Sequence, residues 1–428
     1  MGFILSIVVT IINGILNVLF SLFKNTSYYQ RLEEWKSKVH IHNRLHSTKE
    51  INEMVTKLDF DKLGRTKQLN GKNLKNWYKD DMHQMTIIDS NGNKRTIAIP
   101  YLEIINFNKH PNTKITISCS EEEPLFLNKK YVLPGQIANA TKKCIELVKK
   151  INPKTTDDSH PRLAALKRIG EDEYQCVLEE TNYYTQISSN LSMDFPISID
   201  GHRQTTMRTL ERERHINEMN EWKNYNVIND ALHPRCLTSL ENSLLANVIG
   251  VSAIWCMGDM SNPKFYLMPR NKKVGVYKNK LGMPSGDIES PQKQGNRFKE
   301  ESLMEFLKWE IAREFAEETG IRDINKDFGG YSIDVDPNKI KYETEMEIIP
   351  LALTREMLRG GKPQMFFLIK TDEIPESVLK KCFLASLGVI EFDNAVLTTA
   401  SISAEAACNY LYAMEHVWNS IDDEIDLS

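Results

Sequence analysis

The sequence predicts an α+β protein with one N-terminal transmembrane helix, a mixed α/β middle region and a C-terminal α/β/α sandwich. Three observations support this prediction. Residues 3–23 form an uncharged apolar run. The chain has 428 residues, which is too long for one ordinary core. After residue 240, β-prone and helical segments follow one another in the order strands, helix, strands, helix.

Composition excludes several classes of protein. Hydrophobic residues make up 41% of the chain and charged residues 26%, as in globular rather than disordered proteins. The net charge is −4 and no basic tail is present, so no DNA or RNA partner is expected. The 7 cysteines are scattered without a C-x-x-C pair, which argues against a disulfide framework or a zinc site.

The apolar run at 3–23 is long enough, at ~1.5 Å per residue, to cross ~30 Å of hydrocarbon. Basic residues follow the run and none precedes it, so we expect a single-pass anchor with the C-terminal bulk in the cytoplasm. Asn13 and Asn17 lie four residues apart on one helical face. They favour a homo-oligomer through this helix, or each bonds its own backbone.

The middle region is predicted to occupy residues 25–155. Met85–Pro100 reads as a β-hairpin, because two β-prone runs flank Asn91 and Gly92. A turn at Pro134 and Gly135 precedes a helix that continues to about Ile151. Polar residues at 152–161 are the expected linker.

A connecting region is predicted at 160–240, and ligand sensing is one interpretation of its role. It begins with a strand and a loop, and a charged helix over about 203–223 follows. This helix carries several arginines with two interpretations: they bind a phosphate, or they form a solvated face that is salt-bridged to neighbouring glutamates. The arginines are Arg203, Arg208, Arg212 and Arg214, and the glutamates are Glu211 and Glu213.

The most informative segment predicts a helix from about Glu301 to Thr319, with Gly320 in the left-handed position that ends it. Its glutamates share one narrow face, and like charges so placed repel one another. A divalent cation offsets such repulsion, and carboxylate oxygens are the ligands that Mg²⁺ prefers. The alternative is a solvated acidic face. The glutamates of this face are Glu310, Glu314, Glu317 and Glu318.

This segment resembles the box of the Nudix hydrolases. The residues that match every fixed position of the second half of the box are Arg313, Glu314, Phe315, Glu317, Glu318, Gly320 and Ile321, with Glu305 eight positions before Arg313. The first half departs from the pattern, because Lys299 stands where the family has glycine. Gly286 is the nearest substitute, and residues 287–304 then form an expanded loop.

The resemblance implies a metal site and its catalytic residues. Glu314, Glu317 and Glu318, with the carbonyl of Gly286, would bind Mg²⁺ or Mn²⁺. Glu314, Arg313 and Glu318 would be the catalytic residues, with Arg313 orienting the glutamates. The expanded loop puts the glycine contact and the usual pairing of Glu305 with Arg313 in question.

The flanking segments suit the same fold. Strands are expected at 246–256 and 265–277 before the helix and at 342–354 and 363–371 after it, with a closing helix over 404–421. The hydrolase domain is therefore predicted at 241–428. Alternating glutamates in the third strand supply a further ligand or base, or form a solvated strand face; they are Glu343, Glu345 and Glu347.

By this resemblance the substrate is a nucleoside diphosphate linked to another group. The order of anchor, middle region and Nudix domain also resembles the transmembrane-Nudix effectors associated with CD-NTases in bacterial CBASS antiviral defence. That implies a cyclic nucleotide activator and a location in the bacterial inner membrane. The alternatives are a membrane protein that binds a nucleotide without cleaving it, and an oligomer that disrupts the membrane.

Overall fold

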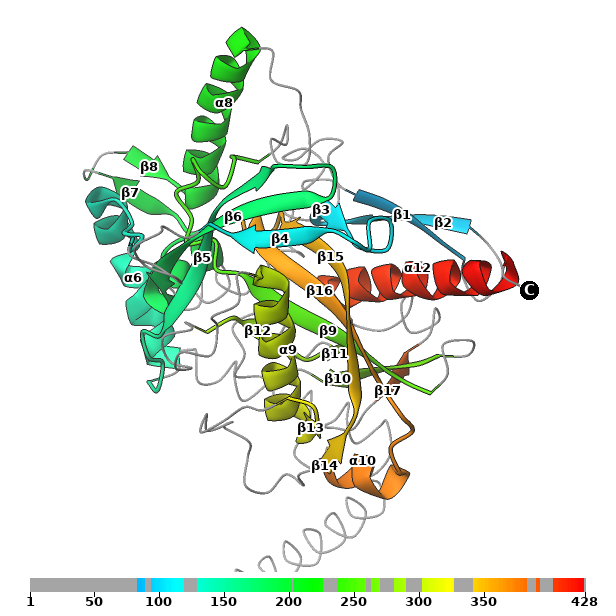
Figure 1. Ribbon diagram of the computed structural model, residues 1–428. Coiled ribbons are helices and arrows are strands. Elements are labelled where there is room, and N and C mark those ends of the chain that lie inside the picture. The colour runs from blue at the N-terminus through cyan, green and yellow to red at the C-terminus, as the bar shows by residue number, and fades with distance from the viewer. Residues whose placement is uncertain are drawn as a thin grey trace, which may run out of the picture. The chain divides into compact units, whose positions relative to one another are not determined.

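The computed structural model describes residues 83–88, 94–118, 129–151, 153–199, 201, 203–225, 237–258, 263–269, 281–289, 302–326, 342–382, 390–392 and 403–426. The predicted anchor at 3–23 lies outside these residues, as does the pair Asn13 and Asn17. None of the described helices is both long and apolar enough to cross a membrane. Within the described residues the expected mixed α+β composition is confirmed (Figure 1).

The strands are β1 (His83–Ile88), β2 (Lys94–Ile99), β3 (Tyr101–Asn106), β4 (Lys114–Ile117), β5 (Ser159–Arg168), β6 (Glu173–Asn182), β7 (Ile197–Ile199), β8 (Arg203–Thr205), β9 (Gly250–Met257), β10 (Lys264–Pro269), β11 (Leu281–Gly282), β12 (Ser285–Asp287), β13 (Ile321–Asp323), β14 (Tyr342–Thr344), β15 (Met346–Glu356), β16 (Lys362–Thr371) and β17 (Ile390–Phe392). The helices are α6 (Gly135–Ile151), α7 (Tyr183–Ile187), the 3₁₀ helix η1 (Asn190–Ser192), α8 (Met207–Tyr225), α9 (Leu303–Thr319), α10 (Glu376–Cys382) and α12 (Ala404–Asp426).

The largest sheet has 8 strands in the order β11-β10-β9-β16-β15-β3, with β12 also paired to β9 and β17 to β10. β9 and β16 are parallel, and the long pair β15–β16 is antiparallel. The predicted strands around the glutamate helix are therefore found as β9, β10, β14, β15 and β16. The central strands β9 and β16 are buried, and their side chains pack against α9 on one face of the sheet and α12 on the other.

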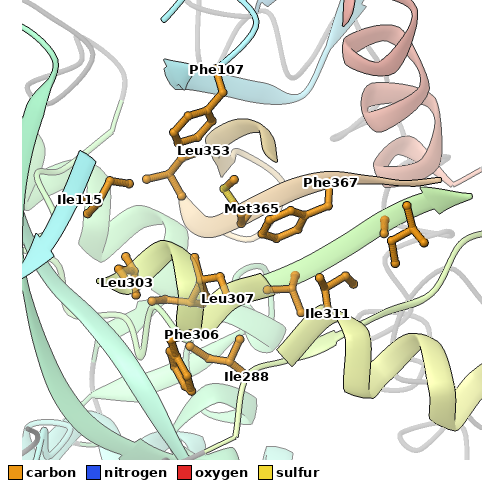
Figure 2. Close-up of a cluster of buried hydrophobic side chains, with 14 of the residues drawn as sticks. Phe107, Ile115, Ile288, Leu303, Phe306, Leu307, Ile311, Leu353, Met365 and Phe367 are labelled. Atoms are coloured by element: carbon orange, nitrogen blue, oxygen red, sulfur yellow. The ribbon is translucent and has the colours of Figure 1, made fainter. Parts of the chain in front are cut away.

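Each face of this sheet packs on one long helix because side chains alternate along a strand. In β16, Met365 and Phe367 belong to the hydrophobic cluster that includes Phe306 and Leu307 of α9, and Figure 2 shows the two β16 side chains on the side of the strand that faces Leu307. Phe366, between them, belongs to the cluster of α12, where its ring lies 6.0 Å from that of Tyr412. The sheet thus lies between α9 and α12.

Elements of the predicted middle region share this core. β3 pairs with β15, so it extends the large sheet. Phe107 and Ile115 lie in the same cluster as Leu303 of α9 (Figure 2). β4 belongs to a second sheet in the order β4-β6-β5. The hydrolase part and the middle region are therefore packed through common hydrophobic contacts.

Two local predictions in the middle region are confirmed. β1 and β2 form the expected antiparallel hairpin, with Ile88 opposite Lys94. The helix expected to end near residue 151 is α6. The strand expected next is β6, but the expected loop after it contains the helices α7 and η1. The charged helix is α8, which begins at Met207 because Arg203–Thr205 form β8. The polar segment expected as a linker at 152–161 ends within β5, which begins at Ser159.

The interpretation of α8 as a solvated face needs correction. Arg208 is 2% exposed and contacts both carboxylate oxygens of Asp194, at 2.7 and 2.8 Å. It also donates to the carbonyl of Leu358, in the connection between β15 and β16. Glu211 is buried and accepts from the amide of Leu244 at 2.6 Å. Arg208 therefore joins the connecting region to the large sheet rather than meeting a phosphate.

The exposed side of α8 includes Arg212, Glu213 and Arg214. Here the solvated interpretation agrees with the structure. The side chain of Arg203 lies outside the described side chains. The division of the helix into a buried polar side and an exposed polar side explains why hydrophobic periodicity gave little information about its packing.

Candidate functional site

Helix α9 begins and ends at well-defined caps. The side chain of Ser302 accepts from the amide of Glu305 at the N-cap. Gly320 has φ 79°, in the left-handed region, and its amide donates to the carbonyl of Ala316. Glycine adopts this conformation without steric cost, so it ends helices of this kind. The predicted span from Glu301 to Thr319 is confirmed to within two residues.

The predicted acidic face is organised around Arg313, which is 1% exposed. Its guanidinium contacts Glu310 at 3.0 Å, Glu317 at 2.9 Å and Glu314. Burial lowers the pKa of Arg313, but Glu314, Glu310 and Glu317 raise it by more. Arg313 therefore stays charged and holds three carboxylates on one side of the helix.

Glu310, rather than Glu305, is the buried partner of Arg313. Glu310 is fully buried and also accepts from the amide of Glu289 at 3.1 Å. Glu305 lies toward the start of the helix and pairs with Lys308 at 3.3 Å. Glu305 therefore lies two helical turns from Arg313 and does not pair with it. Glu310, three positions before Arg313, is the partner instead.

Gly286 lies against the carboxylate of Glu314. β12 pairs with β9 so that Gly286 is opposite Val251. A Cβ atom added to Gly286 would lie less than 3.0 Å from the carboxyl carbon and both carboxyl oxygens of Glu314. Either the strand or this carboxylate would then have to move. The glycine predicted from sequence to replace Lys299 therefore does lie beside a predicted metal-binding glutamate. Lys299 itself lies outside the described residues.

Glu314 is the most strongly perturbed carboxyl of this group. Burial raises its pKa, Arg313 lowers it, and repulsion from Glu317, Glu318 and Glu310 raises it again, to about 8. The side chain is 14% exposed. Arg313 alone therefore does not neutralise the cluster, because three neighbouring carboxylates and the loss of solvent outweigh one guanidinium.

The donor set fits a hard divalent cation in its chemistry. Glu314, Glu317 and Glu318 supply carboxylate oxygens, and the backbone of Gly286 can approach them because it has no side chain. In the described part of the chain, no three His, Cys, Asp or Glu side chains are arranged to hold one ion. Glu314 and Glu317 are turned toward Arg313. A carboxylate accepts at several lone pairs, so this pairing does not exhaust it.

A second buried charge pair adjoins the cluster and was not predicted. Lys362 is fully buried, and its Nζ lies 2.8 Å from Oδ1 of Asp287, the residue after Gly286. Burial raises the pKa of Asp287, but Lys362, His160 and Arg359 lower it by more, to about 2. In the sequence, the only indication of this pair was the position of Asp287 directly after Gly286, the glycine expected to bind the metal.

The alternating glutamates of the third predicted strand are exposed. Glu343, Glu345 and Glu347 lie on the solvent side of β14 and β15. Glu347 is 61% exposed and lies 3.5 Å from Lys370. They agree with the solvated strand face rather than with a further metal ligand or base.

No protein-family model matches the sequence, and no curated protein matches it. The Nudix domain of Shewanella oneidensis NrtR, solved as a complex with ADP ribose, is 13% identical; the similarity covers 40% of this chain and 88% of that one, with a TM-score of 0.25. The C-terminal domain of mouse MUTYH, solved with human PCNA, is 10% identical over 39% of this chain and 88% of that one, with a TM-score of 0.22. Similarities at this level do not assign an activity, so the chemistry is judged from the residues of the site.

Proposed function

We propose that this protein is a Nudix-type hydrolase that uses Mg²⁺ or Mn²⁺ to cleave a nucleoside diphosphate linked to another group. The observation that carries the proposal is the contact of Gly286 with Glu314. It places the backbone of β12 against a helix whose Arg313 already gathers three glutamates. A solvated acidic face would need neither the buried arginine nor the glycine.

Each residue then has a defined part in the chemistry. Glu314, Glu317, Glu318 and the carbonyl of Gly286 would hold the metal, which neutralises diphosphate oxygens and lowers the pKa of water when bound. Arg313 fixes Glu314 and Glu317 in place. Glu314 would be the carboxylate that helps to deprotonate the attacking water.

The cellular setting of the proposal comes from the sequence. The apolar run at 3–23 would anchor the protein in a bacterial inner membrane, with the remainder in the cytoplasm. In this setting the protein would act as an effector of CBASS antiviral defence, with a cyclic nucleotide as activator. The order of anchor, middle region and glutamate helix supports this role.

The test is mass spectrometry of products after incubation of the full-length protein with a panel of nucleoside diphosphate derivatives. Reactions contain Mg²⁺ or EDTA, with or without cyclic dinucleotides and trinucleotides. We expect cleavage at the diphosphate that requires the metal and increases when one cyclic nucleotide is present. Binding of a nucleotide without any cleavage under all conditions would contradict hydrolysis and favour the sensing alternative.

A further inference from the structure

Four consecutive residues beside the glutamate cluster are each held by a different contact. Gly286 is paired with Val251 of β9. Two residues later, the amide of Ile288 donates to the carbonyl of Ile249 at 3.0 Å. The amide of Glu289 donates to a buried side chain of α9, as described above. These contacts all arise within the predicted hydrolase domain.

The same segment is also held from far upstream in the chain. Oδ2 of Asp287 accepts from Nε2 of Gln186, at the end of α7, at 2.8 Å. The carbonyl of Ile288 accepts from Nδ1 of His160, in β5, at 2.8 Å. A carbonyl only accepts, so Nδ1 is the protonated nitrogen of this histidine. Gln186 is fully buried and His160 is 8% exposed.

A second set of contacts ties the same upstream segment to the partner strand of β12. The side chain of Ser189 accepts from the amide of Ala246 at 3.1 Å. Asn190 accepts from the amide of Asn247 at 2.9 Å. These residues lead into β9, on which β12 is paired. Residues 159–190 therefore hold both strands that set the position of Gly286.

We propose that residues 159–190 are a positioning element of the glutamate site, and that Gln186 is its principal positioning residue. Its relevance to catalysis rests on the proposed function. Gly286 lies in close contact with the carboxylate of Glu314, so a small movement of β12 changes the distance between the glycine backbone and this carboxylate. Any ligand that moves α7 would thereby reach the glutamate site through Asp287.

The charge balance at Asp287 explains why a neutral amide is required at position 186. One carboxylate oxygen of Asp287 lies against Lys362 and the other accepts from Gln186. Lys362 supplies the counter-charge in direct contact with Asp287, and the neutral amide completes the hydrogen bonding without adding a second negative charge. A carboxylate at position 186 would repel Asp287. Exchanging donor and acceptor between the two positions would restore the hydrogen bond without changing its geometry.

The experiment compares three full-length variants with the wild-type protein: Gln186→Glu, the exchange Gln186→Glu/Asp287→Asn, and the control Gln136→Glu. Gln136 is exposed on α6, so its variant adds the same charge at a distance. Hydrogen exchange of the Ile288 amide reports the position of β12 without requiring activity. Electron paramagnetic resonance of Mn²⁺ reports metal affinity.

We expect Gln186→Glu to accelerate exchange at Ile288 and weaken Mn²⁺ binding by at least ~10-fold, as for residues that support metal ligands. The exchange variant should recover part of both losses, because it restores the amide–carboxylate hydrogen bond but leaves Lys362 without a carboxylate in direct contact. Gln136→Glu should match the wild type. If Gln186→Glu does not fold, Gln186→Met removes the amide without adding charge and is judged by the same measurements.

Two outcomes separate this inference from the proposed function. Wild-type exchange rates and Mn²⁺ affinity in a folded Gln186 variant would overturn the positioning role, whatever the activity. Absence of Mn²⁺ binding in the wild-type protein would overturn the proposed function, and the exchange rate at Ile288 would then decide the positioning role alone.

Discussion

Gly286 lies so close to the carboxylate of Glu314 that a methyl group at position 286 would overlap it. This contact joins two segments whose connection, residues 290–301, lies outside the described residues. Because glycine has no Cβ atom, the backbone of β12 comes close to the carboxylate of Glu314. The expanded loop is thus compatible with the arrangement expected of a metal site.

Gly286→Ala should impair the site, because the new methyl group must displace either β12 or Glu314. We expect a clear loss of metal-dependent turnover and only a small loss in unfolding free energy, because the end of the Glu314 side chain can turn aside. Urea unfolding and product assays measure the two effects. Gly135→Ala is the matched control, since a Cβ there meets nothing within 4 Å. Equal behaviour of the two variants would argue against the contact.

Arg313→Met should destabilise the protein by ~3–5 kcal/mol, because it leaves buried carboxylates without their shared cation. The loss should shrink at low pH, where the carboxyl groups are protonated. Urea unfolding at pH 5 and pH 8 tests both statements. Arg212→Met, on the exposed side of α8, removes the same charge from a helix surface and should change stability little. A loss that does not depend on pH would contradict this account of Arg313.

The metal-free protein should lose stability as pH rises. The pKa of Glu314 is raised to about 8 from an ordinary 4.5, so the folded state binds more protons than the unfolded state between these values. The stabilising contribution is complete below pH 4.5 and is lost as pH rises through 8, at up to ~1.4 kcal/mol per unit. Urea unfolding in EDTA measures this slope.

Mg²⁺ should flatten that slope, because the ion favours the charged carboxylate. Glu314→Gln should remove the contribution of this group both with and without metal. If wild-type protein and Glu314→Gln have the same pH dependence in EDTA, the raised pKa is not a property of this residue.

Asp287→Asn should destabilise the protein by ~3–5 kcal/mol near neutral pH, since it leaves Lys362 buried without its counter-charge. The folded-state pKa of Asp287 is about 2 against an ordinary 3.8. Its contribution is therefore present above pH 3.8 and is lost as pH falls through 2. Combining Asp287→Asn with Lys362→Met should recover part of the loss. Additive losses in the double variant would show that the two groups are not a pair.

The sequence was most informative where local rules decide the structure. Gly320 predicts the end of α9, and the three- and four-residue spacing predicts that Glu314, Glu317 and Glu318 share a face. The apolar run within residues 363–371 likewise predicts the strand found as β16.

Long-range pairing could not be predicted in this way. Nothing local indicates that Gln186 meets Asp287, 101 positions away, or that β3 joins β15. Arg208 was expected on a solvated face because its neighbours are charged, but tertiary contacts bury it against Asp194. Arg313 likewise pairs with Glu310 rather than Glu305, because the start of α9 sets which glutamate lies within reach.

The most direct test of the central claim is the rate of Mg²⁺-dependent diphosphate cleavage in Glu318→Gln, beside the exposed α6 variant Glu146→Gln. Each substitution removes one carboxylate charge from a helix. We predict that Glu318→Gln loses at least ~100-fold in rate, the size expected when metal stabilisation of charge is lost, and keeps its unfolding midpoint. Glu146→Gln should retain full activity. A folded Glu318→Gln variant that cleaves the substrate at the wild-type rate would contradict the assignment of this helix as the catalytic metal site.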